Sequence, residues 1–116
     1  MEVIKTEGAP EPIGPYSQGI LAKNIIFTSG QIHPEGSIEM QTAKVLEYID
    51  NILAAKECDM SQIAKVNVYL KDLGDFKAMN DVYERQMPHK PARACVQVAR
   101  LPKDALVEID VIAVSK

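Results

Sequence analysis

The stretch Val107-Glu108-Ile109-Asp110-Val111-Ile112-Ala113-Val114, near the end of the chain, carries the clearest indication of the fold. Successive side chains of a strand point to opposite faces, so every second residue shares a face. One face of this stretch is wholly apolar and consists of Val107, Ile109, Val111 and Ala113. The opposite face carries Glu108 and Asp110 among aliphatic residues. The pattern predicts a strand over 106–114 with one face in a core and a second face of mixed polarity.

Strands are also expected over four other ranges: 16–21, 25–31, 64–70 and 93–99. The first two are joined by a short polar connection that suits a hairpin. The third range alternates as the last strand does, and its apolar face would hold Ala64, Val66, Val68 and Leu70. Its other face would hold Lys65, Asn67 and Tyr69.

Two helices are expected between these strands. An apolar stripe at three- and four-residue spacing marks the first helix: Val45, Leu46, Ile49, Ile52 and Leu53. Ser37 is placed to cap its start. The second helix would begin at Asp75 and end before Pro88, because proline cannot continue a helix. Its inward face would hold Phe76, Met79, Val82, Tyr83 and Met87.

These elements predict an α+β fold in which two helices cover one face of a five- or six-stranded sheet. The helices would cover the apolar face. The second face would then be the mixed one, with Asn67, Tyr69, Arg93, Cys95, Gln97, Glu108 and Asp110 among aliphatic residues. A surface of that kind is too apolar to be left wholly in water, so subunits are expected to associate through it and to create clefts between them.

Composition narrows the class of protein. The 116 residues suit a single domain, 1–116, and 47% apolar with 25% charged residues is ordinary for a globular chain. A net charge of −3 offers no basic stripe, so nucleic acid is not an expected partner. No stretch predicts a secretion signal or a membrane span, and the cytoplasm is the expected location. Cys58 and Cys95 are therefore expected to be free thiols, although they could in principle pair.

Arg93 is the leading candidate for a ligand-binding residue. Its planar guanidinium group can hold a carboxylate through two hydrogen bonds and stays charged at physiological pH. The alternative is a structural ion pair with Glu108 or Asp110, and the pattern alone leaves both open. Those two acids could supply a general base or orient a water, although a pair of acids on a strand more often forms an ion-pairing or solvated edge. Cys95 could be a nucleophile if a base lowered its pKa, or it could be inert packing.

Other kinds of site find little support. His33 and His89 are far apart in sequence and have no cysteine or carboxylate at metal-ligand spacing, so no metal site is expected. Gly30 and Gly36 belong to no phosphate-binding fingerprint.

Four motifs, in order along the chain, resemble the RidA/YjgF family of enamine/imine deaminases. They are Ile13-Gly14-Pro15-Tyr16-Ser17-Gln18-Gly19, Thr28-Ser29-Gly30-Gln31-Ile32, Val68-Tyr69-Leu70-Lys71-Asp72-Leu73-Gly74-Asp75-Phe76, and the run from Pro91 to Lys103. The resemblance covers nearly the whole chain and extends into the last strand. It implies a chorismate-mutase-like fold and a homotrimer built around a central barrel, with active sites between subunits.

The same resemblance implies the reaction and its residues. The activity would be cofactor-free hydrolysis of 2-imino acids, such as 2-iminopropanoate and 2-iminobutanoate, to 2-oxo acids and ammonia. Arg93 would hold the substrate carboxylate, Cys95 would contribute its backbone carbonyl, and Glu108 would position the attacking water. The remaining lining would come from Tyr16, Ser29, Gly30 and Asn80. Loops 32–37 and 87–91 are shorter than usual for the family and leave the preferred substrate size open.

A second reading is a non-catalytic or regulatory module that binds a small carboxylate, or a translation-inhibitor-like interaction protein. A pure binder needs Arg93 but has little use for a water-positioning Glu108. An RNA-acting protein should show a basic surface, which this sequence lacks.

Overall fold

Six strands form one mixed sheet in the computed structural model, which describes residues 1–115. The order across the sheet is β1-β2-β3-β6-β4-β5. The strands are β1 (Glu2–Ile4), β2 (Gly19–Ala22), β3 (Ile25–Thr28), β4 (Ile63–Leu70), β5 (Ala92–Gln97) and β6 (Val107–Val114). Strands β4 and β5 pair in parallel, and the other neighbouring pairs are antiparallel. The predicted α+β architecture is confirmed. Strand β1 was not predicted, because its three residues are too few to show an alternation.

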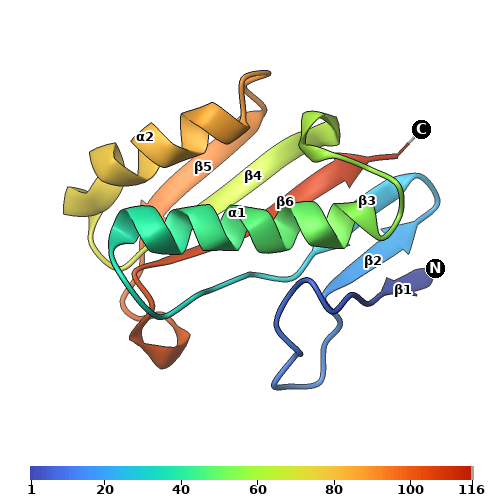
Figure 1. Cartoon of the computed structure of the whole chain (residues 1–116), viewed down its shortest axis with the longest axis horizontal. Helices are drawn as coiled ribbons and strands as arrows, with labels where there is room; N and C mark the ends of the chain where they lie inside the picture. The colour runs from blue at the N-terminus through green and yellow to red at the C-terminus, as the bar shows by residue number, and fades with distance from the viewer. Residues whose placement is uncertain (116) are drawn as a thin grey trace.

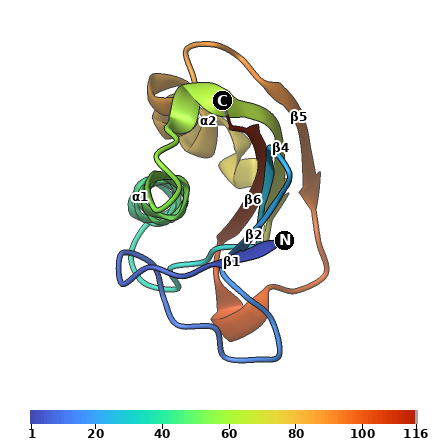
Figure 2. The same ribbon diagram turned by 90° about the vertical axis from the view of Figure 1, so that its right-hand side faces the viewer.

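Both helices, α1 (Ile38–Ala54) and α2 (Phe76–Gln86), lie on the same side of the sheet (Figure 1). Figure 2 shows the opposite face of the sheet with no helix over it. Short 3₁₀ turns occur at Met60–Gln62, Leu73–Asp75 and Pro102–Asp104. Within residues 1–115, no helix has both the length and the apolar character needed to cross a bilayer.

The core lies between the helices and the covered face of the sheet. The apolar stripe of α1 is buried as predicted, and so are Val107, Ile109, Val111 and Ala113 of β6. Ser37 caps α1, because its Oγ accepts a hydrogen bond from the Met40 amide at 3.1 Å. Helix α2 ends at Gln86, ahead of Pro88. Phe76 differs from expectation, since its place at the helix start leaves it 40% exposed.

The prediction of which residues of β4 face the core is wrong at the start of the strand. The pairing with β6 shifts register between Ile63 and Lys65, so Ile63 is buried and Ala64 is exposed. An irregularity of this kind inserts one unpaired residue and interrupts the alternation. From Val66 onward the predicted alternation holds.

The first hairpin is confirmed but shorter than predicted. Strand β2 begins at Gly19 and β3 ends at Thr28, so residues 16–18 and 29–31 lie outside the strands. Gln31 nevertheless makes an isolated bridge to Ile109 of β6. The irregular segments therefore remain beside the sheet.

The predicted face of β5 is also wrong, and this difference matters most for the site. Arg93 is the registered partner of Val66, and Cys95 is the partner of Val68, and both valines are buried under the helices. Registered partners share a face, so Arg93, Cys95 and Gln97 lie on the helix-covered side and not on the mixed face. Alternation within one strand predicts which residues share a face, but not which face of the sheet they occupy.

Candidate functional site

Arg93 is held by one face of α2. Its guanidinium carbon lies 4.8 Å from the ring centroid of Tyr83 and 5.5 Å from that of Phe76. Its Nη1 donates a hydrogen bond to Oδ1 of Asn80 at 2.6 Å. Positions four and three residues apart project from the same side of a helix, so α2 presents all three contacts to β5 together. Arg93 and these three residues are called the Arg93 cluster below.

The Arg93 cluster combines a fixed charge with unused donors. Arg93 is half-buried, and within residues 1–115 its Nε and Nη2 groups make no hydrogen bond. Tyr83 is buried, and its hydroxyl has no hydrogen-bond partner in the same range. Burial raises the pKa of Tyr83, and the positive charge of Arg93 partly offsets this rise. The free edge of the guanidinium group has the geometry to bind a carboxylate.

A cavity of about 450 Å³ adjoins this cluster at the edge formed by α2 and β5. Its lining consists of Asn80, Tyr83, Glu84, Met87, Pro88, Lys90, Pro91 and Arg93. The loop 87–91 therefore borders the cavity.

Glu108 lies on the opposite, uncovered face, beside the segment 29–31. The Gln31 amide donates to the Ile109 carbonyl at 2.9 Å, and the Ile109 amide donates to the Gln31 carbonyl at 3.2 Å. These bonds hold the segment along β6. A Cβ atom at Gly30 would lie 2.2 Å from Oε2 of Glu108, a distance that real Cβ atoms do not show. Glycine at position 30 thus provides the room for the Glu108 carboxylate.

The surroundings of Glu108 make its carboxyl group more basic than usual. Burial raises the pKa of Glu108, and the negative charge of Asp110 raises it further. Asp110 is itself held by Asn67, whose Nδ2 donates to Oδ1 at 2.8 Å. Burial and then Asp110 also raise the pKa of Tyr69. A carboxylate with a raised pKa is a better proton acceptor, which is the property that a general base needs.

The loop before β2 completes this region. Ser29 Oγ donates to the Ser17 carbonyl, and the Ser29 amide donates to the Gln18 carbonyl at 2.9 Å. The buried Gln18 side chain accepts from the Thr6 amide at 2.7 Å and donates to the carbonyls of Thr6, Ala9 and Pro10. Gln18 therefore holds residues 6–10 in place through four hydrogen bonds, and nothing in the sequence pattern indicated that role.

A second cavity, of about 560 Å³, is lined in part by Glu108, Tyr16, Ser29 and Gly30. The rest of its lining is Pro10, Glu11, Pro12, Ile13, Gln18, Gln31, Ile32, His33, Pro34, Tyr48, Pro102 and Lys103. The residues singled out from the sequence therefore fall into two groups. Arg93 and Asn80 line one cavity, whereas Glu108, Tyr16, Ser29 and Gly30 line the other.

Comparison with known proteins identifies the family. A family model described as Endoribonuclease L-PSP matches residues 6–115. The chain belongs to the RidA/YjgF family. A RutC family protein of Pyrococcus horikoshii is 50% identical over 121 residues, covering 97% of this chain and 96% of that protein. Reactive Intermediate Deaminase A of Arabidopsis thaliana, a chloroplastic protein, is 44% identical over 97% of this chain and 65% of its own length.

Solved RidA/YjgF structures confirm the fold. The Escherichia coli YjgF structure gives a TM-score of 0.95 at 38% identity, with complete coverage of both chains. The structure of E. coli TdcF with bound serine gives the same TM-score, identity and coverage.

In this RidA/YjgF chain the Cys95 side chain is poorly suited to be a nucleophile. Cys95 is half-buried against the core, and both it and Cys58 are free thiols. Burial raises the pKa of Cys95, and the nearby positive charge of Arg93 lowers it by less. The thiolate, which is the reactive form, is therefore disfavoured.

The two histidines of this RidA/YjgF chain have other partners. His33 Nδ1 is 2.9 Å from the Tyr48 hydroxyl, and His89 Nε2 is 3.0 Å from the Ile63 carbonyl. Among residues 1–115, no group of three or more His, Cys, Asp or Glu side chains could hold a metal ion.

Proposed function

We propose that this chain is an enamine/imine deaminase that hydrolyses small 2-imino acids, such as 2-iminopropanoate and 2-iminobutanoate, to 2-oxo acids and ammonia. One observation carries the proposal: the fold provides two complementary groups. Arg93 is held by Asn80 and keeps free hydrogen-bond donors, and Glu108, which lies against Gly30, has a carboxyl group of raised pKa. The first group suits a substrate carboxylate and the second suits an attacking water. The relative named Reactive Intermediate Deaminase A supports this reaction. So does TdcF, since serine carries the carboxylate that Arg93 would bind.

The reaction needs water and a proton acceptor. Water oxygen bonds to the imine carbon, and the carbon–nitrogen double bond becomes a single bond. The new hydroxyl group then gives its proton to the departing nitrogen, the carbon–nitrogen bond breaks as the carbonyl group forms, and ammonia and the 2-oxo acid are released. Glu108 would take a proton from the attacking water and return it to the departing nitrogen. A protonated imine is already electrophilic, so holding the carboxylate and orienting the water supply most of what the step requires.

A complete site would require two copies of the chain. Arg93 and Glu108 lie on opposite faces of one sheet and line different cavities. We therefore propose a homotrimer whose sheets pack around a central barrel, so that one subunit's Arg93 faces a neighbour's Glu108. The uncovered face supports association, because it exposes Val3, Phe27, Val96 and Val114.

The other residues would complete this intersubunit cleft. Tyr16, Ser29 and Gly30 would contact the substrate from the side of Glu108, and Asn80 would contact it from the side of Arg93. Cys95 would contribute its backbone carbonyl near the imine nitrogen. We place the protein in the cytoplasm, where two free thiols are stable.

The experiment generates 2-iminopropanoate from alanine with an amino-acid oxidase and traps the surviving imine with semicarbazide. Wild-type protein is expected to lower the trapped fraction. Arg93→Ala is expected to lose about 30- to 5,000-fold in kcat/KM, because truncating one partner of a buried charge pair costs about 2–5 kcal/mol. Arg100→Ala, at an exposed arginine outside both cavities, is the matched control.

Two outcomes would contradict the proposal in different ways. Undiminished trapping in the presence of wild-type protein would show that the chain is not a deaminase and would favour the small-carboxylate-binding alternative. Equal activity of wild type and Arg93→Ala would contradict the role of Arg93 alone.

A further inference from the structure

The cavity that contains Glu108 extends well beyond the groups that would take part in the reaction. Its volume of about 560 Å³ lies within the range of pockets that enclose drug-sized ligands. A three-carbon imino acid is much smaller than such ligands. His33, Tyr48 and Ile32 line the same cavity as Glu108 and Gly30 but have no part in the proposed reaction.

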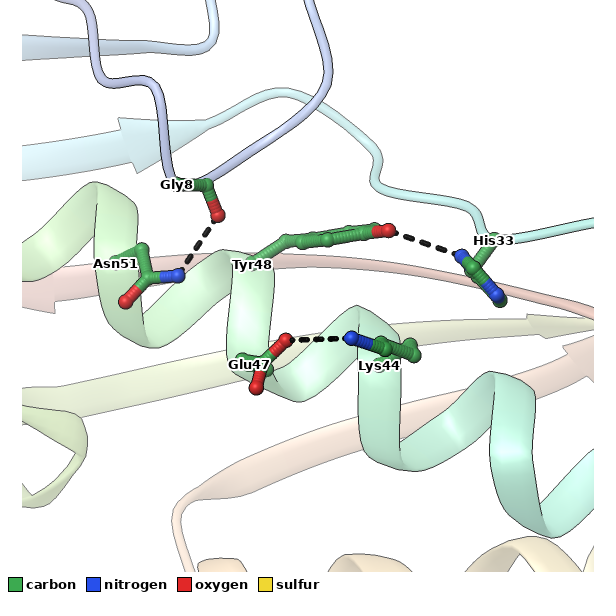
Figure 3. Close-up of polar contacts among 6 residues, drawn as sticks. All are labelled: Gly8, His33, Lys44, Glu47, Tyr48 and Asn51. Atoms are coloured by element: carbon green, nitrogen blue, oxygen red, sulfur yellow. Dashed lines mark hydrogen bonds and ion pairs between the residues drawn. The ribbon is translucent and has the colours of Figure 1, made fainter.

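The far wall of this cavity is fixed by a hydrogen bond between two distant segments. Tyr48 projects from the middle of α1 toward His33 in the segment after β3 (Figure 3). The His33 Nδ1 and Tyr48 Oη atoms are 2.9 Å apart, and the rings are tilted by 58° with centroids 6.0 Å apart. Because the Tyr48 hydroxyl is already paired with His33, its ring can serve as an apolar wall without leaving a polar group unpaired.

The second support for α1 keeps this wall in place. Asn51, one turn after Tyr48, donates from Nδ2 to the Gly8 carbonyl at 2.7 Å (Figure 3). This bond ties α1 to the loop that carries Pro10 and Pro12, which also line the cavity. The wall is therefore part of a connected frame and not a mobile surface side chain.

The chemistry of the lining selects the kind of side chain that fits. Pro10, Pro12, Ile32 and Pro34 add apolar surface to the lining of the cavity that Tyr48 also borders. The exposed ionisable residues at the cavity are Glu11 and Lys103, whose charges are opposite. Apart from Glu108, which the reaction uses, the lining therefore offers no net charge to a charged substrate side chain, whereas aromatic rings pack well on prolines and on another ring.

We propose that the His33 and Tyr48 end of the cavity is a subsite for an aromatic substrate side chain. The substrate class would then include 2-imino-3-arylpropanoates, such as the imine formed from phenylalanine. The inference rests on the proposed deaminase function, since the same cavity would hold the reacting carbon beside Glu108.

The test compares imines made by one amino-acid oxidase from alanine and from phenylalanine, with semicarbazide as the trap. Wild-type kcat/KM for the phenylalanine-derived imine is expected to equal or exceed that for the alanine-derived imine. Ile32→Trp, which fills the subsite, is expected to lower the phenylalanine-to-alanine ratio by about 10- to 200-fold, the effect of small steric changes in apolar pockets. Glu47→Trp adds the same bulk on the exposed side of α1 and should leave the ratio unchanged.

The outcomes separate this inference from the function on which it rests. Wild-type activity on the alanine-derived imine alone overturns the subsite and leaves the deaminase function standing. No activity on either imine overturns the function itself. An equal loss on both imines in a folded Ile32→Trp variant also overturns the subsite. Inhibition by the 2-oxo acid products needs no variant: 3-phenylpyruvate should inhibit wild type more tightly than pyruvate, and the reverse order contradicts the subsite.

Discussion

Among the glycines of the chain, Gly30 leaves the least room for a side chain, because the Glu108 carboxyl group lies against it. An added Cβ would lie 2.2 Å from Oε2 and 2.7 Å from Cδ of Glu108. The glutamate side chain can rotate away from such a contact, so the fold should tolerate it. The proposed catalysis should not tolerate the added Cβ, because the Glu108 carboxylate would have to move away from residue 30.

Gly30→Ala is therefore expected to change the free energy of unfolding by about 1 kcal/mol or less and to lower deaminase kcat/KM by about 100-fold, the effect of displacing a reacting group by about 1 Å. Urea denaturation and the semicarbazide assay measure the two effects. Gly74→Ala is the control, because its Cβ would meet only Asp72 in the turn before α2. Full activity of Gly30→Ala would show that the Glu108 position is not set by this contact.

At the scale of an element, helix α2 acts as the support for Arg93. Phe76, Asn80 and Tyr83 all contact the guanidinium group. A cation over an aromatic ring gains about 0.5–2 kcal/mol, so the ring contacts should restrict where the charge lies. The helical spacing of these three residues was visible in the sequence, but their common target on β5 was not.

Tyr83→Leu is expected to raise KM for the imine by about 3- to 30-fold, with a smaller change in kcat, because a cation–π contact is lost while Asn80 still holds Nη1. Tyr83→Phe keeps the ring and should recover most of the affinity. It also removes a buried hydroxyl that has no partner in residues 1–115, so its stability should equal or exceed that of wild type. Steady-state kinetics and thermal unfolding measure these effects. Equal impairment of both variants would assign the role to the hydroxyl and not to the ring.

At the scale of the whole molecule, the Arg93 cluster and Glu108 lie on opposite faces of the sheet, and this separation leads to a prediction about assembly. In the proposed trimer, Arg93→Ala and Glu108→Gln subunits carry complementary defects. When the two variants are unfolded and refolded together, random mixing should restore about a quarter of wild-type activity, because one cleft in four combines both intact residues in a closed ring of subunits.

Activity of the co-refolded mixture is the measurement, and light scattering should give a mass of three chains. The same variants refolded separately and then combined without exchange are the control and should remain inactive. Absence of recovery in correctly assembled mixed trimers would show that each site belongs to a single chain.

The sequence by itself determined both helices, every strand except β1, and most of the core. The alternation in β6, the apolar stripe of α1, the Ser37 cap and the end of α2 before Pro88 all depend on residues a few positions apart, so local patterns predict them. The motifs also indicated the family and the residues that would carry its chemistry. None of these inferences required knowledge of how one strand lies beside another.

Only the tertiary structure decided where those residues meet. The register of Val66 with Arg93 places the arginine under α2, and the shift near Ala64 changes the start of β4. Gly30 meets Glu108 across 78 residues of chain, and His33 meets Tyr48 from another element. Periodicity sets which side chains of one element share a face, whereas hydrogen bonds between distant segments set which faces and which segments come together.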